Sequence, residues 1–117
     1  MHFYEDLALT AIVIPRAEEM PKQNYMHPAV RILKEYDQKH RTEFLDTLKS
    51  YIMNLGNSGK ILQELHIHRN SLLYRTAKIE ELTGCALSDF ETFLHLALNF
   101  YVMEIRKGQE ERKQMEK

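Results

Sequence analysis

The chain has 117 residues, of which 44% are hydrophobic, and its formal net charge is −1. This length is typical of one domain, and a content of only 4 Gly, 3 Pro and one cysteine excludes collagen, low-complexity disorder, an intramolecular disulfide and a thiolate zinc site. The longest apolar run, from Leu7 to Ile14, is too short to span a bilayer, so we expect a soluble, cytoplasmic protein.

A first helix is predicted over residues 3–14, followed by a loop over residues 15–27, which contain two prolines and show no apolar period. A second helix is predicted to begin at Pro28, because a first helical turn does not need the N–H that proline lacks. It should end at about Gln38. Its predicted buried stripe has a spacing of three: Val30, Leu33 and Tyr36.

Thr42 is predicted to cap a third helix, with Glu43 in the first turn of that helix. Gly56 and Asn57 should end it, because glycine readily adopts the left-handed conformation that follows many helices. The apolar residues of this helix recur on one face: Leu45, Leu48, Ile52 and Leu55.

A short helix and a longer helix are predicted next, joined by a tight turn at His66 and Ile67. Asn57 or Ser58 caps the short helix, and the longer one runs from His68 or the following residue to a glycine cap at Gly84. The inward-facing residues are predicted to be Ile61, Leu62 and Leu65 in the short helix, and Leu72, Ile79 and Thr83 in the longer one.

Ser88 is predicted to cap a last helix, with Asp89 and Glu91 in its first turn. Its apolar face is expected to join the core and is also a candidate dimer seam: Phe90, Phe93, Leu94, Ala97, Leu98, Tyr101 and Ile105. Residues 106–117 are polar on all sides and form either a frayed helical extension or a disordered tail.

These patterns predict an all-α fold of five or six helices around a helix-turn-helix core, because no segment shows the alternation of a strand. The expected divisions are an N-terminal helix and loop, a central domain containing the helix-turn-helix unit, and a polar tail: residues 1–27, 28–105 (with the unit at about 58–83) and 106–117.

The helix pair also contains the basic part of the chain. Residues 60–78 carry a net charge of +3, from Lys60, Arg69, Arg75 and Lys78 against Glu64. A stretch of this length often reaches that charge by chance, but a positive patch on a nearly neutral chain also suits a small DNA-binding element. In helix-turn-helix units the second helix enters the major groove, and its first residues approach base edges.

A helical wheel separates the two faces of this second helix. The outer arc is polar, aromatic and cationic, and no carboxylate interrupts it before Glu81: Asn70, Ser71, Tyr74, Ala77 and Lys78. Repulsion by DNA phosphates would favour such an absence of acid, whereas a solvated helix face normally mixes both signs.

The segment from His68 to Arg75, followed by Lys78 and Ile79, resembles the "HRNTLxYR…KI" signature of the PucR/CdaR family of bacterial transcription regulators, with Ser71 in place of Thr. The residues 33–37 resemble the "LxxYD" of that family, and residues 45–52 its "LxTLxxYL". Further matches occur at Asn57, at 65–68, at 82–84 and at 96–98. Departures are Leu62, where such units usually have alanine, Ile61, where the family often has threonine, and Thr76, where it usually has an apolar residue.

The resemblance implies a C-terminal helix-turn-helix domain whose signature starts the recognition helix, here about residues 69–83. It implies sequence-specific binding to double-stranded DNA, for which we expect a homodimer. Members of the family carry long N-terminal sensory regions, so any effector is expected to be sensed by a region absent from this chain, which resembles a fragment of a longer regulator or a stand-alone remnant.

The candidate DNA-binding residues are Ser58, Lys60, His68, Arg69, Asn70, Ser71, Tyr74, Arg75 and Lys78. Asn70 could recognise adenine or serve as a local cap, and Tyr74 could contact DNA or pack on a neighbouring helix. Arg75 could hold the fold through a carboxylate or contact DNA. His68 is also a candidate cap of the recognition helix.

Ser71 could bond a phosphate or a base edge, while Arg69 and Lys78 suit phosphate contacts. Backbone N–H groups near Ser58 and Lys60 attract phosphate, because they open a helix.

No metal, cofactor or enzymatic activity is expected. The pair His66 and His68 lacks a nearby third ligand, and Cys85 has no arranged base. The alternative function, from a different class, is a helical protein–protein interaction or dimerisation module that has lost DNA binding.

Overall fold

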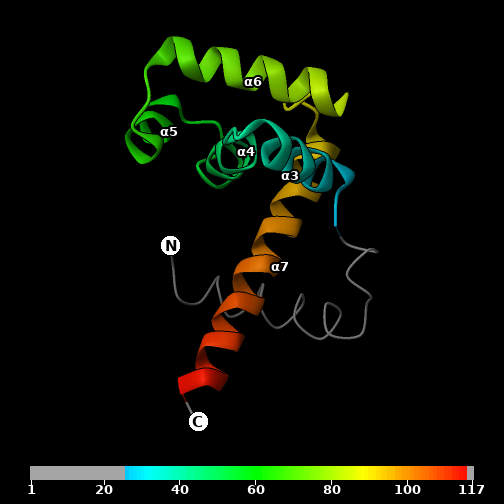
Figure 1. Ribbon diagram of the computed structural model, residues 1–117, viewed down its shortest axis with the longest axis vertical. Coiled ribbons are helices and arrows are strands. Elements are labelled where there is room, and N and C mark those ends of the chain that lie inside the picture. Colours follow the sequence, from blue (N-terminus) through cyan, green and yellow to red (C-terminus); the bar gives the residue numbers. More distant parts are fainter. Residues whose placement is uncertain (1–25, 116–117) are drawn as a thin grey trace. The chain divides into compact units, whose positions relative to one another are not determined.

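The computed structural model describes residues 26–115, apart from the side chains of Gln109 and Lys113, so the helix expected over residues 3–14 lies outside the described residues. The described part is all-α, with five helices and no strand: α3 (Pro28–His40), α4 (Phe44–Met53), α5 (Ser58–Leu65), α6 (Arg69–Thr83) and α7 (Phe90–Met115) (Figure 1). This confirms the predicted fold class. Within these residues, no helix is long and apolar enough to cross a membrane.

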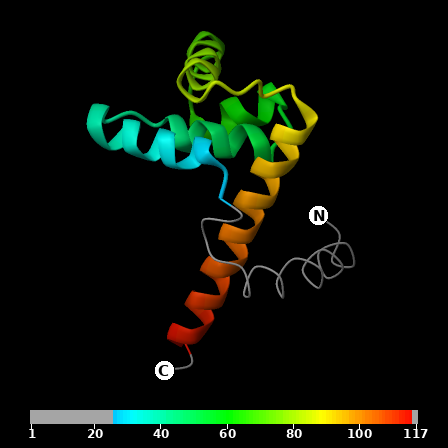
Figure 2. The same cartoon turned by 90° about the vertical axis from the view of Figure 1, so that its right-hand side faces the viewer.

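Residues His27–Ala97 form one compact unit, and α7 from Leu98 onward belongs to a second unit. In the first unit α6 packs against α3, α4 and α5, and α4 also packs against α3 and α5. Figure 2 shows α3 lengthwise and α6 nearly along its axis, so these two packed helices run in clearly different directions. The core of this unit is built from fully buried aliphatic side chains: Leu33, Leu48, Ile52, Ile61, Ile79 and Leu96.

Helix α3 begins at Pro28, as the sequence predicts, and Arg41 ends it in the left-handed conformation. His27 caps it, because its Nδ1 accepts a hydrogen bond of 3.0 Å from the backbone N–H of Ala29. Burial lowers the pKa of His27, and the neighbouring His95 ring lowers it further to a smaller extent. A lowered pKa favours the neutral imidazole, which is the form that can accept this bond.

The N-terminus of α4 is capped by a residue of the preceding helix. The Asp37 carboxylate accepts hydrogen bonds from the backbone N–H groups of Phe44 (3.0 Å) and Leu45 (2.9 Å) and from the Thr42 hydroxyl (2.5 Å). The prediction that Thr42 caps α4 is therefore wrong, because the left-handed turn at Arg41 folds the chain back and brings Asp37 onto the free N–H groups. A negative charge there also complements the helix dipole.

Helix α4 ends at Met53, two residues earlier than the apolar pattern indicates. Leu48 and Ile52 are buried as predicted, but Leu55 is exposed because it lies beyond the helix, in the left-handed conformation. Gly56 follows it with a φ of 72°, a value that glycine adopts without steric cost.

Helices α5 and α6 have the predicted boundaries. Of the two predicted caps for α5, the structure has Asn57, whose Oδ1 accepts a hydrogen bond from the N–H of Lys60 (3.1 Å). His66, with a φ of 54°, occupies the left-handed position of the turn between α5 and α6, where helix-turn-helix units often have glycine. Gly84 ends α6 in the left-handed conformation, as predicted. Ile61 is fully buried, whereas Leu62 is half-buried.

Helix α7 corrects two predictions. Asp89, not Ser88, caps it, because the Asp89 carboxylate lies directly before the helix and accepts bonds from the N–H and the hydroxyl of Thr92. Both bonds lower the pKa of Asp89, and the bond from the backbone N–H has the larger effect. The predicted core face is wrong at Phe90, Leu94 and Leu98, which are exposed. The buried residues of α7 include Leu96, Asn99, Phe100 and Val102, none of which belongs to the predicted face.

Candidate nucleic-acid interface

Helix α6 has apolar residues on both of its sides. Leu72 and Ile79 are buried against the core, as predicted, while Leu73 and Tyr74 are exposed. In α5, by contrast, the apolar residues gather on one side of the helix. An amphipathic surface helix normally presents polar residues to solvent, so the outer side of α6 is unusual.

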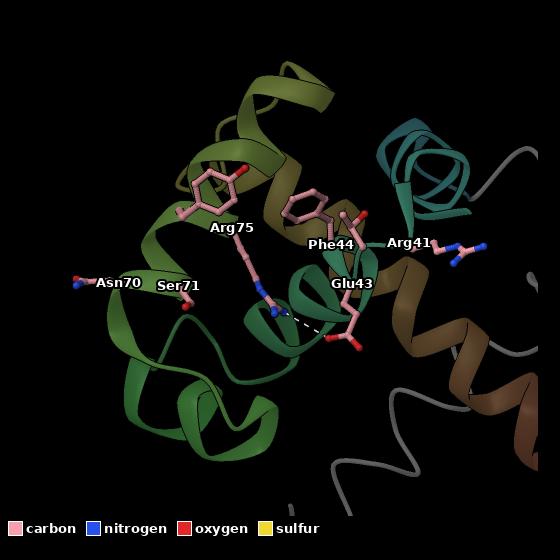
Figure 3. A pocket seen from close by; sticks show the side chains of 8 residues that line it. Arg41, Glu43, Phe44, Asn70, Ser71 and Arg75 are labelled. Atoms are coloured by element: carbon pink, nitrogen blue, oxygen red, sulfur yellow. Dashed lines mark ion pairs between the residues drawn. The ribbon is translucent and has the colours of Figure 1, made fainter. Parts of the chain in front are cut away.

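Four polar residues on this outer side, Arg69, Asn70, Ser71 and Tyr74, have no side-chain partner within the part of the chain that the structure describes. The side chains of Arg69, Asn70 and Tyr74 are exposed there, and that of Ser71 is half-buried. Asn70 makes no local capping bond among these residues, and its amide points away from α4 (Figure 3). These donors and acceptors are therefore available to an external ligand.

Arg75 points in another direction. Its guanidinium donates a hydrogen bond of 3.0 Å to the Thr47 hydroxyl and lies 3.8 Å from a carboxylate oxygen of Glu43. Figure 3 shows this side chain reaching from α6 toward Glu43 at the start of α4. Both partners belong to α4 or to the residue before it, so Arg75 links α6 to the α4 region.

A groove of about 560 Å³ separates the loop before α4 from the first half of α6. Its lining combines two arginines, one carboxylate, two aromatic rings and three other polar residues: Arg41, Thr42, Glu43, Phe44, Asn70, Ser71, Tyr74 and Arg75. The groove brings together four of the predicted DNA-binding residues, which are Asn70, Ser71, Tyr74 and Arg75. In Figure 3 the Arg41 guanidinium points away from α6.

The remaining predicted residues lie at the start of α5, directly before α6 and within the second half of α6. Ser58 and Lys60 are exposed in the first turn of α5. His68 occupies the cap position of α6, but its side chain makes no capping bond, so its predicted role as a cap is not supported. Lys78 is half-buried one turn beyond Tyr74, and its Nζ lies 3.6 Å from a carboxylate oxygen of Glu81.

Carboxylates appear on α6 only in its second half, and each has a partner. Glu80 accepts a hydrogen bond of 2.9 Å from the N–H of Leu87, and Glu81 pairs with Lys78. The first ten residues of the helix, 69–78, contain no acid. The carboxylate near that acid-free part is Glu43, and sequence spacing could not reveal it because Glu43 is far from Arg75 in the chain.

Leu73 is the candidate interface residue that the sequence interpretation left out. Leu73 lies about 60° from Asn70 on a helical wheel, and this proximity could have identified it as a candidate interface residue from the sequence. Among the described residues, no group of three or more His, Cys, Asp or Glu side chains is arranged to hold a metal ion.

The comparisons with known proteins agree with this arrangement. The sequence matches the family described as the PucR C-terminal helix-turn-helix domain over residues 44–102. It is 36% identical to the proline-responsive transcriptional activator PutR of Bacillus subtilis over 80 residues, which cover 68% of this chain and 20% of the relative. It is 29% identical to the purine catabolism regulatory protein of the same organism over 96 residues, which cover 74% of this chain and 18% of the relative.

The chain thus spans about a fifth of the length of these curated relatives. No solved structure gives a significant match.

Proposed function

Because the chain belongs to the family with the PucR C-terminal helix-turn-helix domain, we propose that it binds double-stranded DNA with α6 in the major groove, as the DNA-binding part of a transcriptional regulator. The observation that carries this proposal is the outer side of α6, which is free of acid over residues 69–78 and presents unpartnered polar side chains.

Charge and exposure favour a division of roles along this helix. Exposed Asn70 has one side-chain amide, whose NH2 donates and whose carbonyl oxygen accepts, as a bidentate bond with adenine requires. Arg69 and Lys78 suit phosphate contacts. Ser71 and Tyr74 have hydroxyl groups for either kind of contact. Ser58 and Lys60 lie in the first turn of α5, and His68 directly precedes α6, so their polar groups lie near helix N-termini, which attract phosphate.

Titration of the chain with duplex DNA over a series of salt concentrations tests this function. Two or more phosphate contacts would make the logarithm of the affinity fall linearly with the logarithm of the salt concentration, with a slope of about −2 or steeper. A scrambled duplex serves as the control for specificity. The proposal fails if no DNA is bound at about 100 µM protein and low salt.

We also propose that the chain binds its site as a homodimer. Phe90 and Leu94 lie one turn apart on α7 and are both exposed, which gives a second copy an apolar face to bury. A two-fold dimer would set two copies of α6 about 34 Å apart, one turn of DNA.

Light scattering with and without DNA measures the oligomeric state. Leu94→Glu should give a monomer, whereas Met53→Glu, at a similarly exposed site on α4, should not. A wild-type chain that stays monomeric at high micromolar concentration in both conditions would contradict the dimer.

The alternative is a helical interaction module without DNA binding, which the same exposed apolar residues of α7 favour. Such a module would bind a protein partner without the steep salt dependence. We propose no catalytic role for the chain. Cys85 is half-buried, and its Sγ lies 3.6 Å from the carbonyl oxygen of Thr83.

A further inference from the structure

Leu73 is the large aliphatic side chain on the outer side of α6. It is 58% exposed, and the next residue, Tyr74, is 63% exposed. A single exposed leucine is common in proteins. Here, however, Leu73 continues into Tyr74 and into exposed Ala77 one turn later. An apolar strip therefore runs along a helix whose other outward residues are polar.

The strip lies beside Asn70, which is three residues before Leu73. Side chains at this spacing are neighbours on one helix face, about 5–6 Å apart at their Cβ atoms. Three residues of helix advance by about 4.5 Å, slightly more than the rise of one base pair. A helix that brings Asn70 to one base pair therefore brings Leu73 to the next pair or just beyond it.

The major groove offers one apolar group to such a side chain, the C5-methyl group of thymine. We propose that Leu73 determines specificity by packing on a thymine methyl group next to the base pair that Asn70 contacts. This inference rests on the proposed function and names the base that one side of α6 recognises. The neighbouring cations Arg69 and Lys78 hold the helix at the phosphates, and Leu73 excludes water from the methyl group.

Replacing thymine by deoxyuridine removes this methyl group and leaves the hydrogen-bonding edge unchanged. The preferred site of the full chain is first selected from a random duplex library, and each of its thymines is then replaced in turn. One replacement should lower the affinity of the wild-type chain about fourfold, as expected for one methyl group taken out of water. The same replacement should cause no further loss in Leu73→Ala.

Leu55→Ala is the matched control, because Leu55 is also an exposed leucine but lies between α4 and α5. It should keep the full response to deoxyuridine. Circular dichroism checks that both variants remain folded, which we expect because both side chains are exposed.

The outcomes separate the two proposals. If the chain selects no DNA sequence, the proposed function fails, and this inference fails with it. If a site is selected but contains no thymine, or shows no sensitivity to deoxyuridine, the function stands and the role of Leu73 is overturned. It is also overturned if Leu73→Ala loses as much affinity on deoxyuridine replacement as the wild-type chain does. A third contradicting result would be that Leu73→Ala weakens dimerisation and lowers the affinity for the thymine and deoxyuridine duplexes by the same factor.

Discussion

The polar side chains in the corner between α3 and α4 bind one another and the backbone, whereas those on the outer side of α6 face solvent. In the corner, the Asp37 carboxylate accepts three hydrogen bonds, from two N–H groups of α4 and from Thr42. On α6, Asn70 and Tyr74 have no partner among the described residues. Both regions belong to the same compact unit.

The difference indicates which residues serve folding and which are available to a ligand. A polar group that is already bonded contributes to stability and would lose that contribution by turning to a ligand. An exposed polar group without a partner contributes little to stability, so its replacement should affect binding alone. The comparison therefore predicts separate effects of substitutions in the two regions.

The largest effect is expected for Asp37→Ala. This change removes the acceptor for two N–H groups of α4, and we expect it to lower the free energy of unfolding by about 2–3 kcal/mol. Urea denaturation measures the loss. Glu35→Ala is the control: it removes an exposed carboxylate of α3, the helix that also contains Asp37, and should change stability by less than about 0.5 kcal/mol. Equal effects of the two changes would show that Asp37 is not a cap of α4.

Asn70→Ala should have the opposite profile. We expect a loss of about 1–3 kcal/mol in binding to the preferred DNA site, a small loss on random DNA and unchanged stability. Fluorescence anisotropy with both duplexes, together with urea denaturation, provides the three quantities. An equal loss on both duplexes would mean that Asn70 only positions the helix.

Arg75 tests whether the two regions are separate, because it starts on α6 and ends at Thr47 of α4. We expect Arg75→Gln to lower the free energy of unfolding by about 1 kcal/mol, since one hydrogen bond between helices is lost. DNA affinity should change less than stability. Unchanged stability combined with a weaker, salt-dependent affinity would assign Arg75 to DNA contact.

The smallest effect is expected for Lys78→Ala. A lysine that contacts one phosphate contributes equally on all sequences, so its loss should reduce the salt slope by about one unit and leave the sequence preference unchanged. Stability should change by less than about 0.5 kcal/mol, because the partner, Glu81, is exposed and an ion pair within one helix contributes little. A change in sequence preference would instead assign Lys78 to base contact.

Local signals in the sequence predicted much of this fold. Periodicity located Leu33, Leu48 and Ile79 in the core, and the left-handed glycine after α6 was evident at Gly84. Such features depend on residues within one or two turns of each other. The prediction failed on α7, where the apolar residues Leu96, Phe100 and Val102 are buried but Phe90, Leu94 and Leu98 are exposed. Apolar residues lie on more than one side of this helix, so periodicity alone could not decide which side is buried.

Of the candidate interface, too, the sequence could locate one part and not the other. The sequence was sufficient to locate an acid-free helix face with Asn70, Ser71 and Tyr74, because side-chain direction along one helix follows from its 3.6-residue period. Whether these residues contact DNA remains a prediction. The residues that complete the groove at the start of α4, such as Glu43 and Phe44, were not associated with this face in the sequence.

The sequence by itself determined the presence of the five described helices, the helix-turn-helix unit, its glycine cap and the acid-free face of α6. Only the tertiary structure decided that Asp37 rather than Thr42 caps α4, that Arg75 reaches Thr47, and that Leu55 is exposed. The physical reason is that periodicity and capping act within a few residues. The partner of a side chain across two helices depends instead on where the connecting turn directs the chain and on how the helices cross.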